Sequence, residues 1–135
     1  MSVQNTGSTI ERFNAVRWHD SKLLGLSLCR VERADHVKIF LGLLEEGGLL
    51  TPTELVFEDP TYIALQVDLE GKRLCADDIS SAKCHASSEW IRRLSEQNPL
   101  DNFGGYLHFE IDLIPPGGTI DILAKDFVLT TPAPT

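Results

Sequence analysis

The sequence predicts a mainly β protein, an antiparallel β-sandwich or flattened barrel of about seven strands with one amphipathic helix. Along most of the chain, short apolar runs alternate with polar residues at a period of two, which is typical of strands with one buried face. Clusters rich in Gly, Pro and Asp separate these runs at spacings of roughly 8–15 residues, as turns do in all-β domains. An α+β two-layer arrangement is the alternative.

Four strands are expected in the first half of the chain, at residues 22–32, 37–43, 55–57 and 62–69. In the first of these strands Leu24, Leu26 and Leu28 share one face. In the second, Phe40 falls on the face opposite to Ile39 and Leu41, so this strand is expected to be covered on both sides. Residues 45–48 form the following turn, because their paired glycines tolerate positive φ angles.

The middle of the chain contains one extended segment and one helix. Residues 74–86 fit either a strand or an early helix, and the extended conformation is preferred. A helix is expected to begin after Ser87 or Ser88, which are good N-caps, and to stop at Asn98-Pro99. Its apolar residues share one side and should lie against a sheet; they are Trp90, Ile91 and Leu94.

A β-hairpin follows, with strands from residue 106 and from residue 120 on either side of a turn at 114–117. A four-residue turn places Asp112 opposite Thr119 and Glu110 opposite Asp121, with His108 near Leu123. Ile122 and Phe127 fall on opposite parities, so a bulge near residues 124–126 is expected to keep both inward.

Length and composition indicate one domain. A chain of 135 residues with 42% hydrophobic content can bury one core. Residues 1–12 are polar without a period and are expected to be a flexible arm, residues 13–129 to be the β-rich domain, and residues 130–135 to be a flexible tail.

Charge and hydropathy exclude several classes of partner. The formal net charge of −8 disfavours nucleic acid and anionic membranes, and no apolar run reaches the length of a membrane span. No secretory signal is recognised at the N-terminus, and the odd count of three cysteines fits free thiols in a reducing compartment. A bacterial cytoplasmic protein fits these properties best.

The polar face of the hairpin is the most site-like feature of the sequence. Its candidate binding residues are Tyr106, His108, Glu110, Asp112 and Asp121. Carboxylates in this arrangement suit a hard cation, and a close pair of them raises one pKa. The simpler interpretation is the solvated face of an acidic protein, and no metal site is assigned.

Candidate catalytic residues are His19, Asp20 and His108. An adjacent His-Asp step resembles a proton-relay pair, but neighbouring strand residues point to opposite faces and no motif supplies a nucleophile. Cys75 and Cys84 lack the close-spaced second pair of a zinc site, and Cys84 is expected to be an ordinary thiol although Lys83 and His85 flank it. No nucleotide, zinc-protease or serine-hydrolase motif occurs, and no cofactor is expected.

The segment Trp18 to Leu28, W-H-D-S-K-L-L-G-L-S-L, resembles the first strand of small bacterial domains that include immunity proteins of polymorphic toxin systems. Those domains open with a similar His-Asp-Ser or His-Asp-Ala step before a leucine-rich strand. The resemblance covers eleven residues and implies a small β-rich protein that neutralises a toxin by binding it. It transfers no functional residue.

These observations favour a non-enzymatic protein-binding module, with Phe103, Tyr106 and Leu123 as exposed apolar candidates for its interface. The alternative is a small enzyme or ligand carrier with a histidine and carboxylate pocket between the sheets. Self-association to a homo-oligomer through an uncovered edge strand is the third hypothesis.

Overall fold

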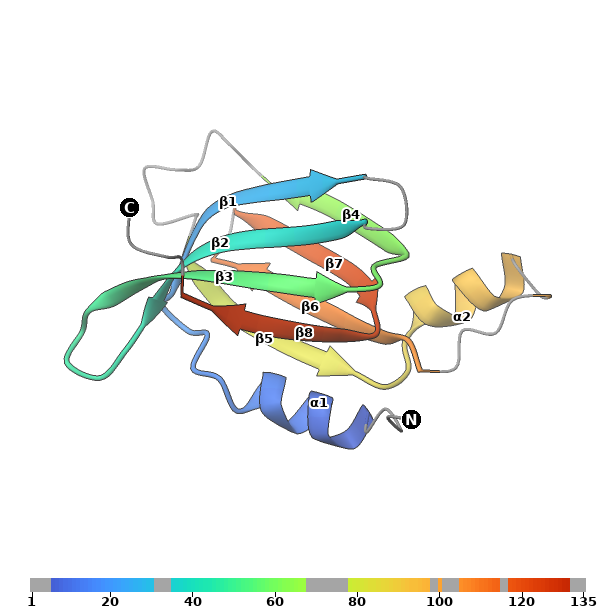
Figure 1. Ribbon diagram of the computed structural model, residues 1–135, viewed down its shortest axis with the longest axis horizontal. Coiled ribbons are helices and arrows are strands. Elements are labelled where there is room, and N and C mark those ends of the chain that lie inside the picture. Colours follow the sequence, from blue (N-terminus) through green and yellow to red (C-terminus); the bar gives the residue numbers. More distant parts are fainter. Residues whose placement is uncertain are drawn as a thin grey trace.

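The computed structural model describes residues 6–30, 35–67, 78–97, 100, 105–114 and 117–131. Within these ranges, eight strands form two four-stranded antiparallel sheets, which we call sheet A (order β1-β2-β3-β8) and sheet B (order β4-β7-β6-β5) (Figure 1). The elements are α1 (Thr6–Asn14), β1 (Lys22–Cys29), β2 (His36–Leu44), β3 (Leu50–Glu58), β4 (Tyr62–Val67), β5 (Ile79–His85), α2 (Glu89–Gln97), β6 (Leu107–Leu113), β7 (Gly118–Ala124) and β8 (Asp126–Thr130).

The predicted fold class is confirmed: the protein is mainly β, and its two sheets stack as a sandwich. The sheets do not close into a barrel, since in the described ranges the only β-bridge between them is the isolated one that pairs Lys22 with Asp78. Every second residue of the central strands points into the space between the sheets, where the side chains are at most 1% exposed; these are Ile39, Leu41, Leu55, Phe57, Phe109, Ile111, Ile120 and Ile122.

The hairpin of β6 and β7 has the predicted register. Asp112 lies opposite Thr119, Glu110 opposite Asp121 and His108 opposite Leu123. The Gly117 amide donates to the Ile114 carbonyl at 2.8 Å and closes the turn.

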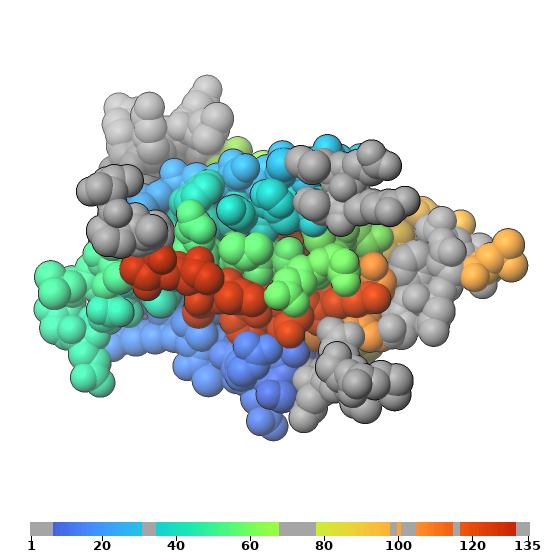
Figure 2. Space-filling view, viewed as in Figure 1, coloured from blue at the N-terminus to red at the C-terminus, as the bar shows by residue number. Residues whose placement is uncertain are grey.

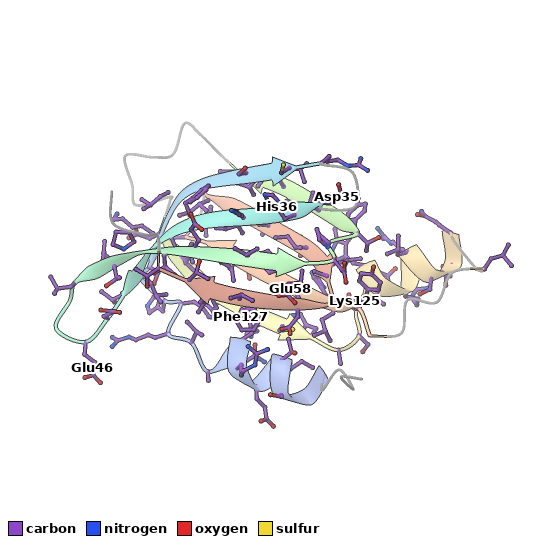
Figure 3. All side chains as sticks on the ribbon, in the orientation of Figure 1. Asp35, His36, Glu46, Glu58, Lys125 and Phe127 are labelled. Carbon is purple, nitrogen blue, oxygen red and sulfur yellow. The ribbon has the colours of Figure 1, made fainter. Side chains whose placement is uncertain are left out.

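The predicted bulge at residues 124–126 is instead a crossing between sheets. β7 ends at Ala124 in sheet B and β8 begins at Asp126 in sheet A. The Lys125 amide donates to the Glu58 carbonyl at 3.0 Å, and Figure 3 places both residues at this crossing. A bulge was expected because Ile122 and Phe127 fall on opposite parities and both had to point inward. The change of sheet has the same result, since both residues are buried.

Two strands of sheet A differ from the prediction. β3 begins at Leu50 rather than at residue 55, although Pro52 lies within it. Proline is tolerated there because β8 pairs only with Glu54 to Glu58, so β3 is an edge strand at Pro52. In β1 a register shift between Leu23 and Gly25 turns Leu24 outward, where it is 61% exposed.

The expectation of a loose arm at residues 1–12 is wrong for residues 6–12, which form most of helix α1. This helix runs along one side of the sandwich, beside the edge strands β5 and β8 (Figure 1). Phe13 is fully buried between the sheets, with its ring centroid 5.0 Å from those of Phe109 and Phe127. The short helix offers only a few apolar residues to a pattern search, which explains why its period was missed. At the other end, Thr130 still belongs to β8 rather than to the tail.

The turn between α1 and β1 ties the two sheets together. Trp18 is 4% exposed, and its indole Nε1 donates at 2.8 Å to the Phe13 carbonyl, which also accepts the Val16 amide at 3.2 Å at the helix end. Asp20 adopts a positive φ of 69°. Ser21 is fully buried and accepts the Leu44 amide on its hydroxyl at 2.9 Å, while its carbonyl accepts the Ile79 amide from sheet B at 2.7 Å.

Helix α2 is confirmed from residue 89 to residue 97. The Ser88 hydroxyl accepts the Ile91 amide at 3.3 Å, as an N-cap does. The helix rests on the outer face of sheet B, where the Trp90 ring lies 5.3 Å from that of Tyr62, yet none of its residues is fully buried. No helix in the described ranges is long and apolar enough to span a membrane.

Substitution of Gly118 tests the close approach between β7 and β4. Gly118 has a φ of 109°, and a Cβ there would lie 1.8 Å from the Gln66 carbonyl oxygen. Gly118→Ala is expected to lower the free energy of unfolding by about 3 kcal/mol, since backbone must move. Gly47→Ala is the control, because Gly47 also has a positive φ but open space around it, and we expect a loss of about 1 kcal/mol. Equal losses of unfolding free energy for the two variants in urea melts would contradict the steric explanation.

Substitution of Phe13 tests whether α1 is part of the folded domain. Phe13→Ala removes a fully buried ring and is expected to cost about 3–5 kcal/mol in urea unfolding. Glu11→Ala, on the exposed side of the same helix, is expected to change stability by less than about 0.5 kcal/mol. A loose arm would make both substitutions equally harmless.

Candidate protein-binding surfaces

The sequence-predicted polar face of the hairpin lies on the outer face of sheet B. Three adjacent strands contribute its side chains, because the cross-strand register aligns every second residue of β5, β6 and β7. We call this group the histidine–carboxylate cluster; it consists of Ser81, Lys83, His85, His108, Glu110, Asp112 and Asp121.

His108 is the buried member of the cluster. It is 5% exposed, and its Nε2 lies 2.6 Å from Asp121 Oδ1. Its Nδ1 is buried and has no hydrogen-bond partner among the described residues. A general base needs a free ring nitrogen within hydrogen-bond reach of the reacting group. The second nitrogen of His108 is closed off from solvent, so this geometry does not support an acid–base role.

The exposed side of the cluster carries closely spaced carboxylates. His85 Nε2 lies 3.0 Å from Glu110 Oε1, and the His85 and His108 rings lie 5.4 Å apart. Burial, then the negative charges of Glu110 and Asp121, raise the pKa of Asp112, while the Ser81 hydroxyl that donates to it at 3.3 Å acts in the opposite direction.

The other catalytic candidates lie on the turn before β1. His19 Nδ1 and Asp20 Oδ1 are 3.7 Å apart, and both side chains are more than half exposed. The buried neighbours of this pair, Trp18 and Ser21, explain the local sequence through packing and backbone hydrogen bonds. The turn therefore holds the fold together and offers no nucleophile.

The apolar residues that were expected to be exposed at an interface differ in their burial. Leu123 is 1% exposed beneath α2, so its predicted exposure is wrong. Tyr106 is half-buried, with Lys125 Nζ 5.4 Å from its ring centroid. Phe103 lies outside the described residues.

Three cavities lined by described residues are small and contain no histidine. One of about 260 Å³ lies near Leu28 and Ile63, one of about 110 Å³ lies beneath α2, and one of about 250 Å³ lies beside Tyr106. None of them matches the expected pocket of histidines and carboxylates between the sheets.

The described residues contain no group of three or more His, Cys, Asp or Glu side chains arranged to hold a metal ion. Cys84 is 3% exposed in the core, where burial, then the charge of Asp126, raises the pKa of its thiol to about 12. The thiol is therefore protonated at neutral pH, which makes it a poor nucleophile. Cys75 lies outside the described residues.

A second surface, on the outer face of sheet A, was missed by the sequence analysis. Neither described helix covers this face, which points toward the viewer in Figures 1 and 2. Apolar side chains gather at the end next to the turn between β2 and β3, where Leu24 is 61% and Leu50 40% exposed. We call this group the sheet A patch; it consists of Leu24, Phe40, Leu44, Leu50 and Pro52.

Two glycines shape the sheet A patch. The position of a Cβ on Gly25 lies 3.5 Å from the Phe40 ring, and one on Gly42 lies 3.4 Å from Leu50 and 3.9 Å from Leu24. The absence of side chains at these glycines lets the apolar groups lie flat against the strands.

Acidic residues border the sheet A patch. Glu54 lies directly opposite Phe40 on β3, and Glu45 and Glu46 follow β2 into the turn, where Figure 3 shows Glu46 at the tip. The outward parity of Phe40 was the available signal for this surface. It was interpreted as a second buried face, whereas no element of the described chain covers it.

Comparisons with known proteins provide no relative from which a function could be transferred. No protein-family model matches the chain, and no curated protein or solved structure matches it significantly. The geometry and charge of the two outer faces are therefore the basis for assigning a function.

The raised pKa of Asp112 gives a pH-dependent prediction. The folded chain holds this proton at pH values where the unfolded chain has lost it, so stability falls as pH rises from the ordinary pKa of 3.8 through the raised value. Asp112→Asn removes the repulsion and is expected to stabilise the protein at pH 7 by about 0.5 kcal/mol in urea melts.

The gain in stability from Asp112→Asn should vanish near pH 3, where the Asp112 carboxyl of the wild-type protein is also protonated. Glu46→Gln, at the exposed tip of the turn, is the control and should change stability little at either pH. A gain of equal size at both pH values would show that the substitution Asp112→Asn acts through packing rather than charge.

Proposed function

We propose that this chain is a non-enzymatic protein-binding module that holds a basic protein partner against the sheet A patch. One observation carries the proposal: an apolar group with an acidic border lies on a sheet face that neither described helix covers. Protein interfaces combine an apolar centre with a polar rim.

The apolar part of the patch supplies affinity. The exposed fractions of Leu24 and Leu50 together equal about one whole leucine side chain, whose burial contributes roughly 2 kcal/mol. Phe40 adds an aromatic ring at the centre, a residue type enriched in interface cores. The flat surface over Gly25 and Gly42 suits a flat or gently curved partner surface.

The charge of the chain supports a basic partner. The net charge of −8 attracts cationic surfaces at long range, and Glu45, Glu46 and Glu54 place carboxylates beside the apolar centre. Lysines or arginines around an apolar patch on the partner would pair with this border. Such binding should weaken as salt is added.

The partner class that we favour is a toxin, with the chain acting as an immunity protein. The resemblance of Trp18 to Leu28 to the opening strand of such domains supports this choice. The small enzyme with an internal pocket is the less favoured candidate, because none of the cavities described above is lined by a histidine.

Partner capture with paired variants tests the proposal. The tagged wild-type chain should retain a basic protein from lysate of the source cell, and raising NaCl from 50 to about 500 mM should release it. The double variant Leu24→Lys and Leu50→Lys should reduce retention at least about tenfold, since it replaces apolar contacts with like charge. Leu65→Lys, on the exposed edge of sheet B, is the matched control and should bind as the wild type does.

Two results would contradict the assignment. Equal capture by the double variant and the wild type removes the sheet A patch from the interface. The partner binds the histidine–carboxylate cluster instead if capture is lost in the variant Glu110→Gln with Asp121→Asn and is kept in the double leucine variant. Circular dichroism spectra establish that each variant is folded.

A further inference from the structure

Four strands lie at the edges of the two sheets in the described part of the chain, and three of them carry a feature that hinders pairing with another chain. The edge strands are β1 and β8 in sheet A and β4 and β5 in sheet B. Unprotected edges expose backbone donors and acceptors that can add a further strand.

Helix α1 protects β5 and β8 together. The Asn14 side chain accepts the Cys84 amide at 2.8 Å and donates to the Cys84 carbonyl at 3.4 Å, so it takes the place of a neighbouring strand on β5. Arg12 bonds Asp126 at 2.8 Å and lies over the Phe127 ring, which ties the helix to β8. β1 contains the register shift after Leu23, and such an irregularity disrupts a regular ladder.

β4 carries none of these features. Its register with β7 runs without interruption from Tyr62 to Val67, and among the described residues β7 is its only partner strand. No residue from Thr61 to Val67 is charged. Leu65 is 53% exposed and Tyr62 is 43% exposed, so the edge is also apolar.

We infer that β4 pairs with β4 of a second copy of this chain, in antiparallel orientation about a twofold axis. Pairing of this kind joins the two B sheets into one continuous eight-stranded sheet. Because the whole strand is uncharged, no register brings like charges together, although each chain carries a net charge of −8. The second copy also extends the cover over Leu65, whose cross-strand pairing with the buried Ile120 directs it toward the interior.

The same edge explains why a second copy is favoured over the basic partner proposed for the sheet A patch. A cationic surface gains little from an uncharged strand, whereas an acidic chain can pair this strand with its own copy without bringing charged side chains of the two strands together. Dimerisation by this route should strengthen as salt screens the net charges, the opposite of the salt response expected for partner capture.

Mass and hydrogen exchange at several concentrations test the inference. Light scattering should give a mass that rises from the 15.0 kDa of one chain toward twice that value between about 5 and 500 µM, because one short strand pair forms a weak interface. Amide exchange of residues 62–67 should slow at the higher concentration. Leu65→Lys should weaken dimerisation at least about tenfold, and so should Gln66→Lys, which alters a side chain that is already exposed.

The double variant Leu24→Lys with Leu50→Lys is the control and should dimerise as the wild type does, since it alters the other sheet. A mass of one chain at every concentration overturns the inference. A dimer that Leu65→Lys and Gln66→Lys leave intact also overturns it, because association then uses another surface. Circular dichroism spectra identify any variant that fails to fold, and Gln66→Lys then decides the outcome.

Discussion

The structure depends on closing the space between two open sheets, since an apolar interior must be covered along both sides as well as by the sheets. On the side of β5 and β8, helix α1 inserts Phe13 between the edges and Asn14 completes the hydrogen bonding of β5. On the side of β1 and β4, the inward-directed Leu28 and Leu65 each remain 53% exposed. The sandwich is therefore asymmetric, and its incompletely covered side is the one at which we propose that a second copy pairs.

Three short segments in the described part of the chain hold the sheets in their relative positions, and one of them is the connection from β3 to β4 at residues 59–61. The turn from Trp18 to Lys22 joins α1 to β1 and hydrogen-bonds to the start of β5, and Lys125 carries the chain from β7 into β8. The turn from Trp18 to Lys22 is also part of the segment on which the proposed resemblance to immunity proteins rests. Because Trp18 and Ser21 are buried there and Asp20 occupies a left-handed turn, that resemblance describes how a strand enters the fold. The residues that contact a partner would be found elsewhere in the chain.

Local periodicity predicted the elements that contribute most of the core, and it failed where long-range packing decides the structure. The hairpin register could be derived because turn length and alternation fix it together. Helix α1 could not, since a short polar segment becomes helical only when Phe13 has a pocket to fill. Leu123 was predicted to be exposed, but α2 covers it. Phe40 was predicted to be covered, but the alternation of side chains along a strand does not show whether another layer packs on its outer face.

The described helices cover the two outer faces unequally. α2 packs at one end of the outer face of sheet B, where Tyr62 and Leu123 lie against it, although no residue of that helix is fully buried. Neither described helix lies over the outer face of sheet A, which carries the sheet A patch at one end. Apolar burial is the main favourable term in folding, so leucines that stay exposed on a sheet face contribute little to the stability of the fold. The exposure of Leu24 and Leu50 beside the half-buried Phe40 therefore supports the binding role that we propose for this patch.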